Sequence, residues 1–387
     1  MAKRTFIPMN TNDWLALEER YKFKFPPDFF PLYEELERSR VISDWESDGL
    51  DAYLRLCTPE MIEQRRRNSV DPDIVPIILT PTGGDISLRL PFKSSEPAIW
   101  IETDIETNYR ASVGRSFAGV IRVLAAYMDA WSFDCSADGE LEKASALLRR
   151  SRNVLTDVRG LMDERERERL IRLRFWPLGI AESPVDGNPK ITVPSFRCIR
   201  DMLSLGESLL GWARMEFNDA LEEDPSFGAG RWFMGVAYSR DDNVVGACRE
   251  FSLLMEGDLR TAHPVIDRLY AGAYGDPPVA NFRLAAQYLR THAEEYRLVS
   301  KNSAVSSILL GDGFDKMGAW LDGLRKAMKS GLYDDALPIA QSLLASYSGD
   351  EWFADSGDVD QVGACTDAIG TIYSAAGLEC RVKEMEK

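Results

Sequence analysis

The sequence predicts an α+β domain followed by an all-α domain. Apolar and polar residues alternate with the period of a strand from Ile86 to Leu90 and again near Ile99, whereas helical spacing precedes and follows these segments. From Cys198 onward almost every segment has helical spacing. At 387 residues the chain exceeds the usual size of one domain, so two or more domains are expected.

Two helices open the first domain. In "NDWLALEERYKF", Trp14, Leu17 and Tyr21 lie on one helical face, and Asn12 or Asp13 can cap the helix. The stretch "FPPD" breaks this pattern, and "FFPLYEELER" continues with a second helix, whose first turn tolerates a proline. A short helix is expected over residues 58–67, opened by a threonine and a proline.

A glycine pair, Gly83-Gly84, separates two apolar segments and raises the question of a phosphate-binding loop. Such a loop needs a helix after its glycines, so that free backbone N–H groups point at the anion. Residues 86–90 instead alternate as a half-buried strand, and no Lys-Ser/Thr pair follows the glycines. We therefore expect Gly83-Gly84-Asp85 to be the turn of a β-hairpin. A further strand is predicted from Ile99 to Thr103, followed by a helix over residues 116–131 with Ser116 as its cap.

These segments together resemble the SUKH superfamily, which contains yeast cell-wall regulators and many bacterial immunity proteins. The resemblance covers roughly residues 10 to 132 and rests on three short matches. They are Phe25-Pro26-Pro27-Asp28 at the break between helices, Gly83-Gly84-Asp85 in the hairpin, and Ser116-Phe117 before the last helix. The resemblance implies an α+β fold in which these glycines and Asp85 are structural, and a function in binding and neutralising a toxin.

The middle of the chain is charged. "MDERERERLIRLRF" interleaves acids with arginines, so its charges nearly cancel, which favours a solvated, ion-paired helix over a nucleic-acid-binding patch. Residues 177–194 are rich in Pro and Gly and are a candidate hinge or loop. We therefore expect an α+β domain over residues 1–135, a charged helical connector over 136–200 and a helical domain over 201–387.

The helical domain resembles tetratricopeptide repeats. In residues 319–347, Trp320, Gly331, Tyr333 and Ala336 fall at that family's spacing, and a weaker copy begins near Trp232. The resemblance implies helix pairs that stack on their neighbours and leave a curved binding surface. We expect the two tryptophans to be core residues. The same is expected of five methionines: Met215, Met234, Met255, Met317 and Met328.

Composition narrows the classes of function. The formal charge is −16 and the isoelectric point about 4.8, which disfavours nucleic acids and anionic membranes and favours basic protein partners. Six cysteines without a C-x-x-C pair predict buried free thiols, and the two histidines, His263 and His292, lie in no metal-binding or catalytic pattern. Neither a leader sequence nor a membrane span is expected, which predicts a cytoplasmic protein. The absence of metal-binding and catalytic patterns predicts that it uses no metal and no cofactor.

An acidic stretch is the first candidate site for a partner. From Ser330 to Cys380 there are nine acids and neither Lys nor Arg. Its centre, "GDEWFADSGDVD", places two aromatic residues amid carboxylates, as hot spots in binding surfaces do. The candidate residues are Asp350, Glu351, Trp352, Phe353, Asp355, Asp358 and Asp360. A solvated loop between helices is an open alternative, and a calcium loop is a third, although the spacing of its ligands is missing.

A second acidic set, Glu102, Asp104 and Glu106, alternates after the predicted strand and would share one face. It is a candidate partner surface, and exposed edge residues that prevent aggregation are the alternative. Paired carboxylates could also serve a glycosidase, but nothing in the sequence indicates a cleft. The hypothesis is therefore an immunity protein, not an enzyme, that blocks a cognate basic toxin such as a nuclease. The alternative is a regulatory scaffold whose helical repeats recruit client proteins.

Overall fold

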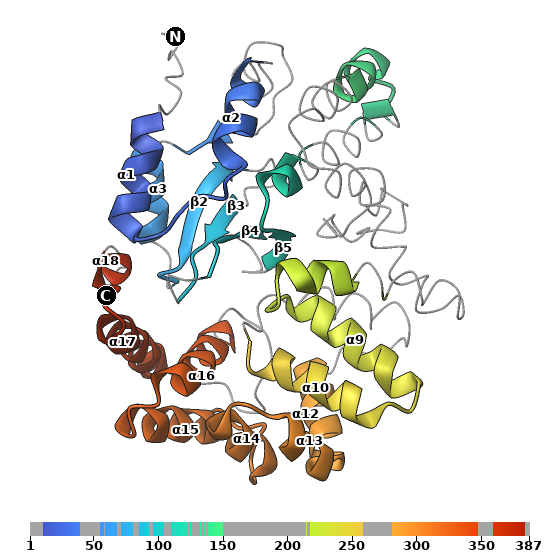
Figure 1. Cartoon of the computed structure of the whole chain (residues 1–387), viewed down its shortest axis with the longest axis vertical. Helices are drawn as coiled ribbons and strands as arrows, with labels where there is room; N and C mark the ends of the chain where they lie inside the picture. Colours follow the sequence, from blue (N-terminus) through green and yellow to red (C-terminus); the bar gives the residue numbers. More distant parts are fainter. Residues whose placement is uncertain are drawn as a thin grey trace. The chain divides into compact units, whose positions relative to one another are not determined.

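The computed structural model divides into two compact units (Figure 1). The first comprises Met1–Ile105 and Ala111–Cys198, and the second comprises Glu106–Arg110 and Ile199–Lys387. The expected three-part division at residues 135 and 200 stays a prediction. The structure describes residues 11–38, 55–57, 59–67, 71–79, 85–92, 96–103, 110–121, 124, 132, 135–136, 138–149, 214, 217–257, 281–346 and 359–383.

The N-terminal unit is α+β, as the sequence predicts. Its described helices are α1 (Thr11–Tyr21), α2 (Phe29–Arg38) and α3 (Pro59–Arg67). Its strands are β1 (Arg55–Leu56), β2 (Ile74–Leu79), β3 (Asp85–Arg89), β4 (Ile99–Thr103) and β5 (Arg110–Gly114), which form one sheet in chain order. The three helices and strands β2, β3 and β4 confirm predictions, whereas β1 and β5 were not predicted.

Strands β2 and β3 pair antiparallel, with Leu79 opposite Asp85 and Pro76 opposite Ser87. The register shifts between Pro76 and Ile78, where β2 has a bulge. A strand and not a helix begins directly after Gly84, as the hairpin interpretation requires. The glycine pair itself lies outside the described residues.

The expectation that β3 is half-buried is wrong. Ile86 and Leu88 are fully buried on one face, but Ser87 on the other face is also fully buried, and Asp85 retains only 8% of its exposure. Both faces of this strand are therefore covered. The alternation of side chains marks two different buried environments and not a core side and a solvent side.

Aromatic rings fill the core of the N-terminal unit. Phe29 stacks on Phe25 with ring centroids 4.3 Å apart, and its ring also lies 5.3 Å from Trp14 and 5.0 Å from Phe117. Trp100 of β4 lies 5.1 Å from Phe117. These rings come from both helices, from the break between them, from the sheet and from the segment after β5, so one cluster joins every layer of the unit.

The described part of the C-terminal unit is helical. Its helices are α9 (Gly228–Arg240), α10 (Val244–Met255), α12 (Asn281–Thr291), α13 (Ala293–Val299), α14 (Ser303–Leu310), α15 (Met317–Lys329), α16 (Tyr333–Ser346), α17 (Val359–Ala375) and α18 (Glu379–Val382). Contacts join α9 to α10, α10 to α12 and α13, α14 to α15 and α16, and α16 to α17. Each helix thus packs on helices close to it along the chain.

Two glycines bring helices into close contact in this unit. A Cβ atom on Gly235 of α9 would lie 2.5 Å from the Phe251 ring, and one on Gly323 of α15 would lie 2.4 Å from Cδ1 of Ile308. Both helix pairs therefore pack more closely than any larger residue allows.

The expected core residues are confirmed only in part. Trp320 is fully buried, and its indole N–H donates to the Phe314 carbonyl at 2.8 Å. Trp232, in contrast, is partly exposed, because its neighbours Phe233 and Met234 take the buried positions of α9. Of the five methionines, Met234, Met255 and Met317 are buried, Met328 is partly exposed and Met215 lies outside the described residues.

Asparagine caps two helices of this unit with different consequences. The side chain of Asn243 accepts from the Gly246 N–H at 2.9 Å, and that of Asn302 accepts from the Val305 N–H at 2.9 Å. Asn302 is buried, and its Nδ2 also donates to the Asp335 carbonyl of α16 at 3.2 Å. Asn302 therefore caps α14 and ties it to α16, whereas Asn243 is exposed and only caps α10.

Asp is as good an N-cap as Asn, so Asn→Asp separates these two roles. We expect Asn302→Asp to lower the free energy of unfolding by about 1–3 kcal/mol, because it removes a buried donor and sets a carboxylate against a carbonyl oxygen. Asn243→Asp is the matched control and is expected to stay within about 0.5 kcal/mol of wild type. Urea denaturation followed by circular dichroism measures both. Equal effects of the two substitutions would show that the bond to Asp335 contributes nothing.

Among the described helices, none is long and apolar enough to cross a lipid bilayer.

Candidate functional site

The predicted partner residues fall largely outside the described part of the chain. Of the seven candidate residues at the centre of the acidic stretch, only Asp360 is placed, in the first turn of α17, and its side chain is not described. The other members, Asp350, Glu351, Trp352, Phe353, Asp355 and Asp358, lie outside the described residues, as do Asp104 and Glu106 of the second set. Both sets therefore stay predictions.

Glu102 is placed in β4, opposite Ile86 of β3. Because β4 lies between β3 and β5, it is not an edge strand, and the interpretation of Glu102 as an edge residue is wrong.

Two of the three short motifs meet in space. The Asp28 carboxylate, at the break before α2, accepts from the Ala118 N–H at 3.0 Å across 90 residues of sequence. The Ser116 hydroxyl accepts from the Gly119 N–H at 3.3 Å, which confirms Ser116 as a cap. The helical segment that begins at Phe117 is therefore capped by one residue beside it and by one from the other motif.

The third motif contributes a buried ion pair. Arg65, in the last turn of α3, donates from Nη1 to Oδ2 of Asp85 at 2.9 Å. Asp85 is the first residue of β3 and is 8% exposed, whereas the Arg65 side chain keeps 30% of its exposure. The pair therefore ties the end of α3 to the start of β3 and holds the carboxylate in the less solvated position.

The surroundings of Asp85 disfavour its charge. Burial raises its pKa to about 6, and the charge and hydrogen bond of Arg65 lower it only in part. Cys57, which follows β1, is close enough to respond: burial raises the pKa of its thiol to about 12, and the Asp85 carboxylate adds to the increase. Asp85 is thus an acid that titrates near neutrality, and Cys57 stays a neutral thiol.

The same face of the sheet carries further oxygen atoms without partners. In the described structure, Oδ1 of Asp85, the Ser87 hydroxyl and the Thr103 hydroxyl are buried and make no hydrogen bond. Thr103 lies directly opposite Asp85 in the register, and Ser87 lies two residues along the same strand. The alternation of strand side chains therefore places all three oxygens on one face. From its sequence context Asp85 was expected only in a turn, and this cluster was not predicted. The signal for it was an acid directly before buried strand residues.

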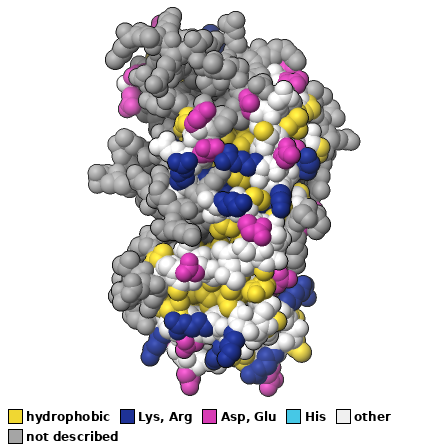
Figure 2. All heavy atoms as spheres, turned by 90° about the vertical axis from the view of Figure 1, so that its left-hand side faces the viewer, with side chains coloured by type: hydrophobic (Ala, Val, Ile, Leu, Met, Phe, Trp, Pro, Cys, Tyr) yellow, Lys and Arg dark blue, Asp and Glu magenta, His cyan; other side chains and the backbone are white. Residues whose placement is uncertain are grey.

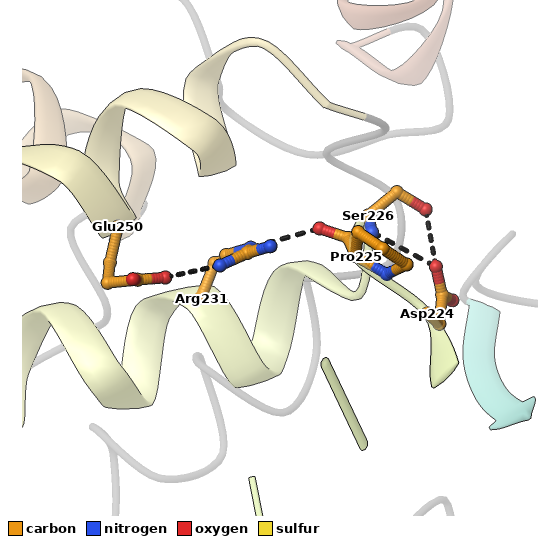
Figure 3. A network of polar contacts seen from close by, with 5 residues as sticks. All are labelled: Asp224, Pro225, Ser226, Arg231 and Glu250. Carbon is orange, nitrogen blue, oxygen red and sulfur yellow. Dashed lines mark hydrogen bonds and ion pairs between the residues drawn. The ribbon is translucent and has the colours of Figure 1, made fainter. Parts of the chain in front are cut away.

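The C-terminal unit has its own buried polar network (Figure 3). Arg231 of α9 donates to Glu250 of α10 at 2.6 Å and to the Pro225 carbonyl at 2.9 Å. Beside it, the fully buried Asp224 accepts from both the backbone N–H and the hydroxyl of Ser226. Figure 3 shows these residues joining the turn before α9 to α10, so this network holds a helix pair together.

One face of the described surface is mixed in charge. In the upper half of Figure 2, at the level where Figure 1 places α1 and α3, Lys and Arg side chains alternate with Asp and Glu. Among the described ion pairs of the N-terminal unit are Arg20–Glu63 at 2.5 Å and Lys24–Glu18 at 2.7 Å. This face of the N-terminal unit therefore offers no field of a single sign for a charged partner.

The described residues contain no group of three or more His, Cys, Asp or Glu side chains that could hold a metal ion. Cys57, Cys135, Cys248 and Cys365 are buried free thiols, as predicted, and Cys380 is partly exposed. Comparison of the chain with protein-family models, with curated proteins and with solved structures finds no match.

Proposed function

We propose that this protein is an immunity protein with a SUKH-like N-terminal domain, and that it binds and neutralises a cognate toxin in the cytoplasm. The observation that carries the proposal is the bond between Asp28 and the Ala118 N–H. Asp28 and Ser116-Phe117 belong to two of the three matches on which the sequence resemblance rests, and these residues lie beside Phe29 and Trp100 in the core. The pattern that suggested the family is therefore also the pattern that packs this fold.

Neutralisation on this proposal occurs through protein contact and requires neither a catalytic group nor a cofactor. The charge of −16 favours a basic toxin, such as a nuclease, because opposite charges speed the encounter of two proteins. The acidic stretch around Trp352 and Phe353 is the proposed docking surface.

The direct experiment uses the toxin encoded beside this protein's gene. We expect the two purified proteins to form a stable complex in size-exclusion chromatography, and co-expression to restore growth to cells that produce the toxin. If no complex forms and the toxin still kills cells that contain this protein, the proposed function is wrong.

Interface variants then test the location of the contact. Neutralising Asp350, Glu351, Asp355, Asp358 and Asp360 together is expected to slow association and to flatten its dependence on salt. Trp352→Ala or Phe353→Ala is expected instead to raise the dissociation rate, by about 30-fold for a hot spot of about 2 kcal/mol. Surface plasmon resonance separates the two rates. Unchanged rates in all these variants, with binding abolished by substitutions at Glu102, Asp104 and Glu106, would move the interface to the N-terminal unit.

A regulatory scaffold is the second candidate. The stepwise contacts from α9 to α17 favour it, because tetratricopeptide-like helices that pack on their neighbours leave an extended surface for client proteins. Figure 2 also shows a band of apolar side chains at the level where Figure 1 places α16 and α17. Retention of several unrelated host proteins, in place of one tight partner, would favour this function.

A further inference from the structure

In the contact between Arg65 and Asp85, only one of the two carboxylate oxygens receives a hydrogen bond. The Asp85 side chain keeps only 11% of its exposure, yet only Oδ2 has a donor, and no donor reaches Oδ1 in the described structure. An ionised carboxylate accepts through both oxygens, so one buried oxygen without a donor disfavours the charged form. A protonated carboxyl has the opposite need, because its O–H requires an acceptor.

Acceptors for such a proton lie on the same face of the sheet. The Ser87 and Thr103 hydroxyl oxygens are both buried and without partners, one on the strand of Asp85 and the other directly across from it on β4. When Asp85 is protonated, its carboxyl thus exchanges the Arg65 guanidinium of α3 for a hydroxyl oxygen of Ser87 or Thr103 in the sheet. Arg65 then loses the negative charge that attracts it, and because its side chain is partly exposed, the guanidinium can move into solvent.

We propose that Asp85 and Arg65 form a pH-sensitive latch between α3 and the β2–β3 hairpin. The ionised carboxylate holds the Arg65 guanidinium of α3, and the protonated carboxyl turns to the hydroxyl oxygens of its own sheet face and releases Arg65. The rest of α3 stays attached, because Arg66 donates to the Ile74 and Pro72 carbonyls. Neither of two other ionisable residues near Asp85, Cys57 and Glu102, is expected to replace it as the group that titrates. Cys57 beside β1 stays a neutral thiol, and the neighbouring β4 position, Glu102, lies on the opposite face of the sheet.

The sign of the pH effect follows from the direction of the shift. The pKa of Asp85 rises from 3.8 to about 6 on folding, so the folded unit binds a proton more tightly than the unfolded chain does. The contribution of this group to stability is therefore most favourable below about pH 4 and is lost as the pH rises through 6. Most buried ion pairs of carboxylates have the opposite dependence.

The test follows the Asp85 side-chain carboxyl by ¹³C NMR during a pH titration of the full chain. We expect a midpoint of about 6. On acidification through that midpoint, amide hydrogen exchange in α3 is expected to accelerate. Ser87→Ala and Thr103→Val preserve the shape of the site. Each is expected to lower the midpoint of the Asp85 titration, because it removes an oxygen that accepts a hydrogen bond from the protonated carboxyl.

Asp85→Asn imitates the neutral carboxyl without changing its shape. Its urea midpoint is expected to exceed that of wild type at pH 7.5 and to approach it at pH 5. Glu63→Gln is the matched control, because Glu63 lies on the same helix α3 and forms an exposed ion pair with Arg20 of α1. Its difference from wild type is expected to be equal at the two pH values. An Asp85 midpoint near 4, or a pH-independent difference between Asp85→Asn and wild type, overturns the latch.

Discussion

Phe29→Ala is expected to lower the free energy of unfolding of the N-terminal unit by about 3–5 kcal/mol. The Phe29 side chain is fully buried and lies within ring-contact distance of residues in α1, β4 and the segment after β5, among them Trp14, Trp100 and Phe117. Loss of this ring removes its transfer free energy and leaves a cavity between elements that other contacts hold apart. A small domain has about 5–15 kcal/mol in total, so this substitution removes a large share of it.

Phe30→Ala is the matched control, one residue along the same helix. Phe30 is only partly buried and packs at the margin of the cluster, 5.1 Å from the Phe29 ring. We expect a loss of about 1 kcal/mol, several-fold smaller than at Phe29. Hydrogen exchange measured by mass spectrometry in peptides from α1 and α2 distinguishes the two. Similar protection in both variants would show that Phe29 is not the centre of this core.

Gly323→Ala is expected to destabilise the C-terminal unit by about 1–3 kcal/mol. The added methyl would lie 2.4 Å from Cδ1 and 2.8 Å from Cγ1 of Ile308, so α14 and α15 must separate or a side chain must leave its rotamer. Gly318→Ala makes the same change in the same helix, at a position where a Cβ meets nothing within 4 Å. There we expect no loss and a gain of up to about 1 kcal/mol, because alanine restricts the unfolded chain.

A second substitution identifies the contact responsible. Ile308→Val removes Cδ1, the nearest atom, so Gly323→Ala is expected to cost less in that background than in wild type. Thermal unfolding of the four proteins gives the coupling energy. If the two changes in unfolding free energy simply add, the contact between residue 323 and Cδ1 of Ile308 is not the source of the strain.

The sequence predicted the regular elements better than it predicted their surroundings. Trp14, Leu17 and Tyr21 formed a clear helical stripe, and all three are buried as that stripe requires. β5, Arg110–Gly114, was not predicted because Ala111 and Val113 are its only apolar residues, too short an alternation to stand out, and its neighbour β4 supplies the pairing.

Burial was harder to predict because it depends on segments distant in sequence. Ser87 looked like a solvent-facing position and is fully buried, since alternation reports two faces and not which of them meets water. Trp232 looked like a core residue and is partly exposed, because Phe233 and Met234 occupy the inner face of the helix. Asp85 was assigned to a turn for the same reason: its partner Arg65 lies 20 residues away, and no local pattern joins them.

The hydrogen bond between Asp28 and the Ala118 N–H also limits the order in which this domain can fold during its synthesis. Its two ends are 90 residues apart, and a ribosome that adds about 5–20 residues per second needs roughly 5–20 seconds to make the intervening chain. For most of that interval Trp14, Phe25 and Phe29 are already synthesised while Trp100 is not, and Phe117 is added only at its end. The nascent chain therefore presents an incomplete aromatic cluster to chaperones, and its core closes in a late step, after the last strand of the sheet has been made.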